Sequence, residues 1–199
     1  MRTGRTMIGL SIVLGSLAMA ATASATDGHW TNLANSSMYL GVAGGGQHCD
    51  PRWCYLNEGT RLIVWQSAGT WLSDQYWSTT TPGTGIVRDY YNRYPDSASM
   101  CMGVQGGSGA GPGARLIMWH CDTGSYPDQN WEIIPWYDSR IQAPFSGCYV
   151  FRNTMTNLYM GVAGGNVSNG TDVIQWGFIK GTANVDDGTW HKDQFWCPR

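Results

Sequence analysis

Hydrophobic and polar residues alternate along short segments of this chain. In the segment from residue 61 to 65, Leu62 and Val64 point to one side of an extended backbone, and Ile63 and Trp65 point to the other. Glycine and polar residues bound the segment on both sides. The pattern predicts a strand that turns one face to the core and shows an Ile and a Trp on its second face.

This alternating block occurs three times, in register with two other blocks. The alternating block occurs at 59–65, 113–119 and 170–176. A glycine-rich block precedes it in each unit, at 39–45, 101–107 and 159–165. An Asp-Gln-x-Trp block follows it in each unit, at 74–77, 128–131 and 193–196. A further strand is predicted to open each unit, near 30–33, 85–90 and 148–152. The repeats extend approximately over 28–80, 81–134 and 135–199.

Twelve short strands follow from this arrangement. One four-stranded unit cannot bury its apolar side alone and would expose sheet edges, so we expect the three units to pack around a shared axis into a closed all-β fold. The segments 47–56 and 181–188 are insertions that leave the blocks intact, which places them in surface loops. The composition agrees, because 27 glycines, 11 tryptophans and only 13% charged residues favour short strands and tight turns over long helices.

The first 25 residues have the features of a secretory signal peptide. Arg2 and Arg5 precede an apolar run from residue 7 to 21, and the small residues at 23–25 suit cleavage after Ala25. The alternative is a membrane anchor, but the run is short for a spanning helix and no basic cluster follows it. We expect a secreted, extracellular protein with no membrane span.

Six cysteines follow the expected signal peptide: Cys49, Cys54, Cys101, Cys121, Cys148 and Cys197. An even number in an exported protein predicts disulfides, and the sequence alone leaves their pairing open. A metal site is the alternative, carried only by His48, Cys49 and Cys54. No second Cys or His pair stands at zinc-ligand spacing, so we expect no metal.

Three Gln-x-Trp motifs, each after a glycine-bounded strand that ends in Trp, resemble the ricin B-type lectins. The resemblance covers nearly all of the chain after residue 25, and three copies in register with two other blocks make it specific. That family folds as a β-trefoil, and many members bind sugars in shallow pockets, up to one in each repeat. The resemblance therefore implies a β-trefoil and sugar binding.

The resemblance also implies roles for the closing blocks and the cysteines. The Gln-x-Trp tryptophans are core residues in the family and the glutamines are largely structural, which here gives Trp77, Trp131 and Trp196 with Gln75, Gln129 and Gln194. A frequent family disulfide between the first and second blocks corresponds to Cys101–Cys121. Cys49–Cys54 would then close the first insertion, and Cys148–Cys197 would tie the start of the third repeat to the end of the chain.

The predicted sugar pockets depart from the family pattern. Sugar-binding repeats of the family usually carry an Asp where this chain has Gly41, Gly103 and Gly161, and commonly a Gln where it has Ile63, Ile117 and Ile174. Two lost hydrogen bonds, each worth about 0.5–1.5 kcal/mol, lower the expected affinity for galactose by about one or two decades. The retained ligand-binding residues are Trp65, Trp119, Trp176, Asp74, Asp128 and Asp193. We expect the indoles to stack on the apolar face of a sugar and the carboxylates to accept hydroxyl hydrogen bonds.

Catalysis, cofactors and nucleic acid are not expected. Glu58 and Glu132 are the only glutamates, and the four histidines show no triad context with Ser and Asp. Among the histidines, His120 borders the predicted pocket beside Trp119, and the sequence identifies no partner for it. The net charge of −2 is too small to predict binding to nucleic acid or to an anionic membrane.

The sequence therefore predicts a secreted carbohydrate-binding module whose partners are glycans or a glycosylated surface. The alternative is a trefoil that binds another protein or a lipid, such as a non-catalytic toxin subunit or an inhibitor. An Ile and a Trp on the outer face of every repeat would form an apolar patch, which often marks a partner surface.

Overall fold

The computed structural model describes residues 28–44, 57–67, 73–79, 84–93, 99–121, 126–179 and 190–199. The expected signal peptide at 1–25, the expected Cys49–Cys54 disulfide and both predicted insertions lie outside the described residues.

The described residues are all-β, as predicted, with five short turns of 3-10 helix. The strands are β1 (Trp30–Asn32), β2 (Asn35–Val42), β3 (Thr60–Gln66), β4 (Trp77–Thr79), β5 (Thr84–Arg93), β6 (Ser99–Val104), β7 (Leu116–His120), β8 (Asn130–Pro135), β9 (Tyr149–Asn153), β10 (Tyr159–Val162), β11 (Val173–Trp176) and β12 (Trp196–Pro198). The 3-10 turns are η1 (Ser73–Gln75), η2 (Gly107–Gly109), η3 (Pro127–Gln129), η4 (Ala163–Gly165) and η5 (Lys192–Gln194). In this part of the chain no helix has the length and apolar character needed to cross a membrane.

The first and last strands of the three units form a closed barrel. Antiparallel pairing runs from β1 to β12, β9, β8, β5 and β4 in turn. The ring closes where Gly28 and Trp77 exchange two backbone hydrogen bonds of 2.9 Å. A closed barrel leaves no free edge among these strands. A four-stranded unit alone would expose its sheet edges.

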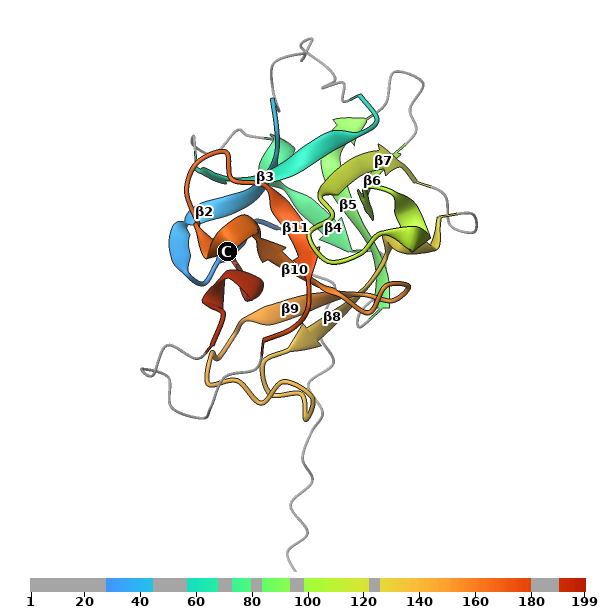
Figure 1. The fold of residues 1–199 in the computed structure, drawn as a ribbon. Coiled ribbons are helices and arrows are strands. Elements are labelled where there is room, and N and C mark those ends of the chain that lie inside the picture. The colour runs from blue at the N-terminus through green and yellow to red at the C-terminus, as the bar shows by residue number, and fades with distance from the viewer. Residues whose placement is uncertain are drawn as a thin grey trace, which may run out of the picture.

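Three hairpins cover one end of this barrel. They are β2–β3, β6–β7 and β10–β11, and each joins the other two through β3–β7 pairing and the bridges Ile63–Asp172 and Arg115–Ile174. In Figure 1 the β10–β11 hairpin lies between β2 and β3 on one side and β6 and β7 on the other. Where the hairpins meet, Arg61 and Arg115 both bind the Asp172 carboxylate, at 2.6 and 2.7 Å. This barrel with a triangular cap is the β-trefoil architecture.

The core fills the space between barrel and cap. Its largest members are four fully buried tryptophans, Trp30 and the three of the closing blocks. Each closing-block indole N–H donates a hydrogen bond to a carbonyl oxygen of the hairpin in the same unit: Trp77 to Leu40 at 2.9 Å, Trp131 to Met102 at 3.0 Å and Trp196 to Met160 at 3.3 Å. The same contact in all three units ties every barrel strand pair to its own hairpin.

A second apolar cluster lies where the loop after β8 packs against the end of the chain. Phe145 contacts the rings of Trp190 and Phe195, with centroids 5.9 and 4.9 Å apart. The Cys148–Cys197 disulfide joins the two segments, with an S–S distance of 1.96 Å. The other expected pair that the structure describes, Cys101–Cys121, is also bonded, at 2.00 Å. In the third unit the matching place holds a ring contact between Tyr159 and Phe178, with centroids 4.8 Å apart.

The outer face of the alternating strands differs from the expectation. Ile63 and Ile117 are only 7% and 8% exposed, because bridges and pairing between the hairpins cover them. Trp65 and Trp176 do face solvent, at 41% and 45% exposure. The outer apolar surface of the hairpins is therefore narrower than the sequence predicted.

Candidate ligand-binding site

The second and third units each contain a hollow between the hairpin and the following 3-10 turn. The repeat-three pocket is lined by Gly161, Val162, Gly164, Gly165, Ile174, Trp176, Ile179, His191, Asp193 and Gln194. The repeat-two pocket is lined by Val104, Gly106, Gly107, Ile117, Trp119, Tyr126, Asp128 and Gln129. Their volumes are about 350 Å³ and 180 Å³. The two pockets use equivalent positions of their units, so the repeat has produced the same site twice.

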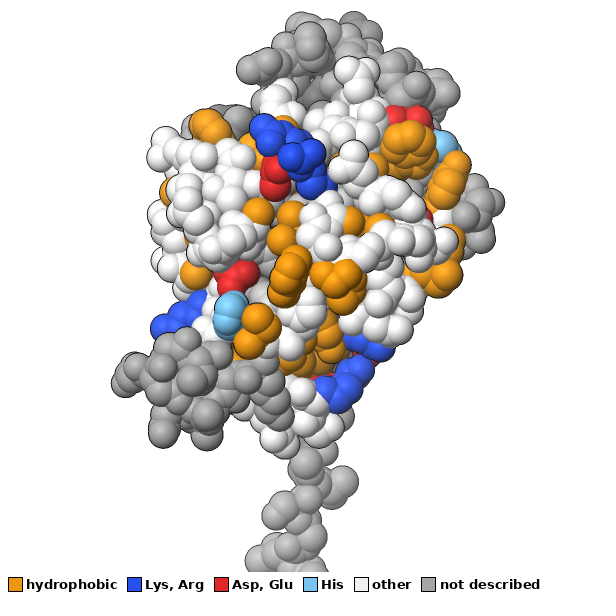
Figure 2. Space-filling model, viewed as in Figure 1, with side chains coloured by type: hydrophobic (Ala, Val, Ile, Leu, Met, Phe, Trp, Pro, Cys, Tyr) orange, Lys and Arg blue, Asp and Glu red, His pale blue; other side chains and the backbone are white. Residues whose placement is uncertain are grey.

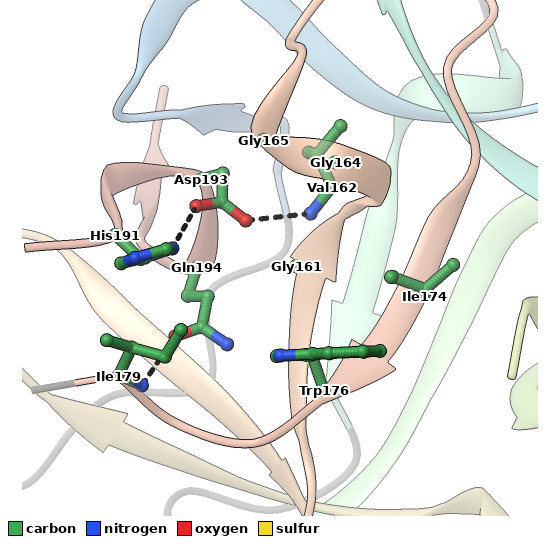
Figure 3. Close-up of a pocket in the computed structure, with 10 residues that line it drawn as sticks. All are labelled: Gly161, Val162, Gly164, Gly165, Ile174, Trp176, Ile179, His191, Asp193 and Gln194. Carbon is green, nitrogen blue, oxygen red and sulfur yellow. Dashed lines mark hydrogen bonds and ion pairs between the residues drawn. The ribbon is translucent and has the colours of Figure 1, made fainter. Parts of the chain in front are cut away.

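Figure 3 shows how the repeat-three pocket is built. Trp176 and Ile174 of β11 form one wall, and His191, Asp193 and Ile179 lie across from them, with the backbone of β10 between. The structure thus brings Trp176 and Asp193 to one hollow, as it does Trp119 and Asp128 in repeat two.

Each of the three block-two tryptophans also lies at a junction between units. A Cβ added to Gly113 would lie 3.5 Å from the ring of Trp176, and one added to Gly170 would lie 3.5 Å from the ring of Trp65. Trp119 has the same relation to Gly59 at 4.0 Å. One edge of each indole therefore lies beside a glycine of the neighbouring unit.

The closing-block carboxylates are held by backbone amides. The N–H of Val104 donates to Asp128 Oδ2 at 2.9 Å, and the N–H of Val162 donates to Asp193 Oδ2 at 3.3 Å. Burial raises the pKa of the Asp193 carboxyl above its ordinary value, while His191 and the Val162 N–H oppose this. The carboxylates are thus partly shielded from water, and hydrogen bonds from the hairpin backbone orient them.

These carboxylates explain why the chain has glycine where the family usually has Asp. A Cβ on Gly103 would stand 2.9 Å from Asp128 Oδ2, and one on Gly161 would stand 3.1 Å from Asp193 Oδ2. The space at the start of the usual sugar-binding side chain is therefore filled by another carboxylate. In this chain the carboxylate that lines each described pocket comes from the closing block rather than from the strand.

The side-chain amides of the closing-block glutamines donate hydrogen bonds to backbone carbonyls near the end of the alternating strand. Gln129 donates to the carbonyl of His120 at 2.8 Å, and Gln194 donates to the carbonyl of Gly177 at 2.9 Å. Gln75 makes the corresponding contacts to Trp65 and Gln66, at 3.4 Å each. Each amide thus joins the 3-10 turn to the end of the alternating strand, behind the pocket.

The first unit is described only in part. Trp65, Asp74 and Gln75 hold the equivalent places, but residues 45–56 and 68–72 around them lie outside the described residues. Asp74 is 7% exposed, and within the described part of the chain its Oδ1 has no hydrogen-bond partner. Burial raises the pKa of this carboxyl, against the backbone N–H groups of Asp74 and Val42.

Sequence reasoning missed several neighbours of the pockets. The sequence identifies no partner for His120, yet in the structure its Nδ1 contacts Glu58 of the first unit. Its ring also meets the ring of Tyr126, with centroids 5.2 Å apart. Tyr126 and His191 both stand two residues before the Asp of their closing block. Their shared position relative to that Asp is the sequence feature that could have identified them as neighbours of the pockets.

The described residues include no group of three or more His, Cys, Asp or Glu side chains arranged to hold a metal ion. Glu132, the second glutamate, is bound by Arg140 and Arg152, each at 2.9 Å. It belongs to a surface ion-pair network and not to either pocket.

The sequence matches a family model described as the ricin-type beta-trefoil lectin domain-like family over residues 73–176, more than half of the chain. This chain belongs to that family. No curated protein matches it in sequence.

Solved structures support the fold of this lectin-like domain. The designed 3-fold symmetric protein ThreeFoil has a TM-score of 0.58 at 15% identity, covering 85% of this chain and 95% of that one. The exo-beta-1,3-galactanase 1,3Gal43A from Clostridium thermocellum gives 0.57 at 16%, covering 88% of this chain but only 30% of the enzyme. The ricin B-like lectin of Macrolepiota procera, solved with lactose, gives 0.50 at 16%, covering 87% and 94%.

Proposed function

We propose that this protein is a secreted carbohydrate-binding module that stacks the apolar face of a sugar on Trp119 and Trp176. One observation carries the proposal: in each described pocket an indole and a partly buried carboxylate line the same hollow. Aromatic rings offer large, rigid contact area to C–H groups. A carboxylate accepts hydrogen bonds from hydroxyl groups, so Asp128 and Asp193 supply the polar half of the contact.

Membership of the lectin-like family supports the same role, and the Macrolepiota procera relative was solved with a disaccharide bound. A binding role without catalysis agrees with the composition of the pockets. Each described lining contains a single carboxylate, whereas glycosidases usually place two across the bond that they cleave.

The structure weakens the argument for the alternative function, binding of a protein or a lipid. It rested on an Ile and a Trp at the surface of every unit, and Ile63 and Ile117 are buried. On the face shown in Figure 2, hydrophobic side chains lie in separate groups between polar ones and do not form one continuous patch. A dispersed apolar surface suits small ligands better than a large partner.

A glycan array with the purified protein tests the proposal. We expect binding to at least one glycan, and we expect the combined substitution of Trp65, Trp119 and Trp176 by Ala to abolish it. Tyr137→Ala is the matched control, because Tyr137 is an aromatic residue, 49% exposed, that lines neither pocket. A folded protein that binds no glycan, or a triple variant that binds like the parent, contradicts the proposal.

A further inference from the structure

The charge of the repeat-two pocket is one-sided. Asp128 is the one acidic side chain in its described lining, and no Lys or Arg is among the lining residues of either described pocket. Asp128 is only 8% exposed. Its Oδ2 accepts a hydrogen bond from the Val104 N–H at 2.9 Å, but an amide is neutral and leaves the negative charge in place. A buried charge without a countercharge is costly, so a ligand that brings a positive charge gains most here.

The walls of this pocket favour the same kind of ligand. Trp119 and Tyr126 both line it, and the faces of aromatic rings attract cations. Ile117 stands where the family commonly has a Gln, so this position offers no amide to a neutral polar substituent. The amide of Gln129, which also lines the pocket, donates to the carbonyl of His120. An aromatic pair beside a carboxylate, with an aliphatic third wall, is complementary to an ammonium group on a sugar ring that has an apolar C–H face.

We infer, on the basis of the proposed glycan-binding function, that these pockets select sugars with a free, protonated amino group over their N-acetylated and neutral counterparts. The ammonium would donate to Asp128 while the sugar ring stacks on Trp119. Acetylation removes both the charge and two of the donors. A sugar with a carboxylate or sulfate would be repelled by Asp128.

The third unit provides an internal comparison. His191 stands where the second unit has Tyr126, and its Nδ1 lies 3.7 Å from Asp193 Oδ1. The rest of that lining, contributed by β10, η4, β11 and Ile179, carries no titratable side chain. At Asp193 a ligand amine competes with the ring nitrogen of His191 for the carboxylate. We therefore expect the preference for an amine to be stronger in the repeat-two pocket than in the repeat-three pocket.

Calorimetric titration with matched sugars tests the inference. Oligomers of glucosamine are compared with N-acetylglucosamine oligomers of the same length and linkage, and galactosamine with N-acetylgalactosamine. A charge-assisted hydrogen bond at a partly buried carboxylate predicts about tenfold tighter binding of the amine. We expect Asp128→Asn to remove most of this preference. Asp138→Asn, which deletes a carboxylate that lines neither pocket, is expected to keep it.

The outcomes separate this inference from the function on which it rests. Equal affinity for amine and acetylated sugars, or a preference that survives Asp128→Asn, overturns the inference and leaves glycan binding in place. No binding to any sugar overturns both. A lysine-containing peptide that binds more tightly than the amino sugars shows that the ammonium recognised is that of a protein, and this also overturns the inference.

Discussion

The contact between Gly103 and Asp128 gives the sharpest prediction. In Gly103→Ala the new Cβ would lie 2.9 Å from Asp128 Oδ2, closer than such atoms approach in proteins, with Gln129 Cγ at 3.4 Å. The carboxylate must move, and its hydrogen bond from Val104 weakens. Overpacking of this kind costs about 1–3 kcal/mol, and the loss of backbone freedom in the unfolded chain returns about 0.4–1 kcal/mol. We expect a net loss of about 1–2 kcal/mol.

The same reasoning predicts how this cost changes in a second background. Asp128→Ala removes the atom that clashes, so adding Gly103→Ala to Asp128→Ala is expected to cost less than about 0.5 kcal/mol, which gives a coupling of about 1 kcal/mol. Urea unfolding measures the free energy of unfolding of all four proteins. In a thermal melt the Gly103→Ala variant is expected to unfold about 2–8 °C below the parent. Gly109→Ala is the control, since nothing lies within 4 Å of its added Cβ. If Gly103→Ala costs the same with and without Asp128, the carboxylate does not occupy this space and our explanation of the glycine is wrong.

Three other predictions concern stability. Trp131→Phe removes the indole donor to the Met102 carbonyl and is expected to lower the free energy of unfolding in urea by about 1–3 kcal/mol. Trp136→Phe, at a ring that is only half-buried, is expected to cost less. Equal costs would contradict the structural role of the closing-block indole. Replacing Cys101 and Cys121 together by Ser opens a loop of 20 residues and is expected to cost about 3 kcal/mol, and a loss below about 1 kcal/mol by the same assay would argue against it. Burial raises the pKa of the Asp74 carboxyl above 3.8, its value in the unfolded chain. The native state therefore binds the carboxyl proton more tightly than the unfolded chain does. The stability that the protonated carboxyl contributes is lost as the pH rises through the native pKa. Asp74→Asn is therefore expected to gain stability relative to the parent as the pH rises above 3.8, and parallel stability curves would refute this.

The repeat pattern was sufficient to predict the fold. Because each unit repeats its blocks in register, the period itself indicates three units, and the alternation of Leu62 and Val64 against Ile63 and Trp65 indicates strands. The closing tryptophans were expected in the core because of the resemblance to the ricin B-type lectins, and they are fully buried. Recurrence alone does not decide burial, since the equally recurrent Trp65 and Trp176 face solvent.

Contacts between units could not be predicted in the same way. Ile63 is buried because another hairpin pairs beside it, and His120 finds Glu58 across a unit boundary 62 residues away. Gln175 stands at a core position of β11, and its amide donates to the carbonyls of Ala110 and Gly111, at 2.9 and 3.0 Å. A periodic pattern describes what the units share, and these contacts depend on where they differ.

Sequence reasoning proposed residues that the structure brings together, while their role in binding a ligand stays a prediction. The retained Trp and Asp positions do line the described pockets, yet the sequence showed Gly103 only as a lost ligand. That Asp128 fills the space above Gly103 depends on the approach of the 3-10 turn to the hairpin, which no spacing along the chain reveals.

The most direct test of glycan binding at these pockets follows the tryptophan side chains by NMR. In a titration with a sugar that the array identifies, the indole N–H signals of Trp119 and Trp176 are expected to shift in a saturable way. Those of Trp77, Trp131 and Trp196, which are fully buried, are expected to stay in place. A sugar that binds while the signals of Trp119 and Trp176 remain unchanged would contradict the account.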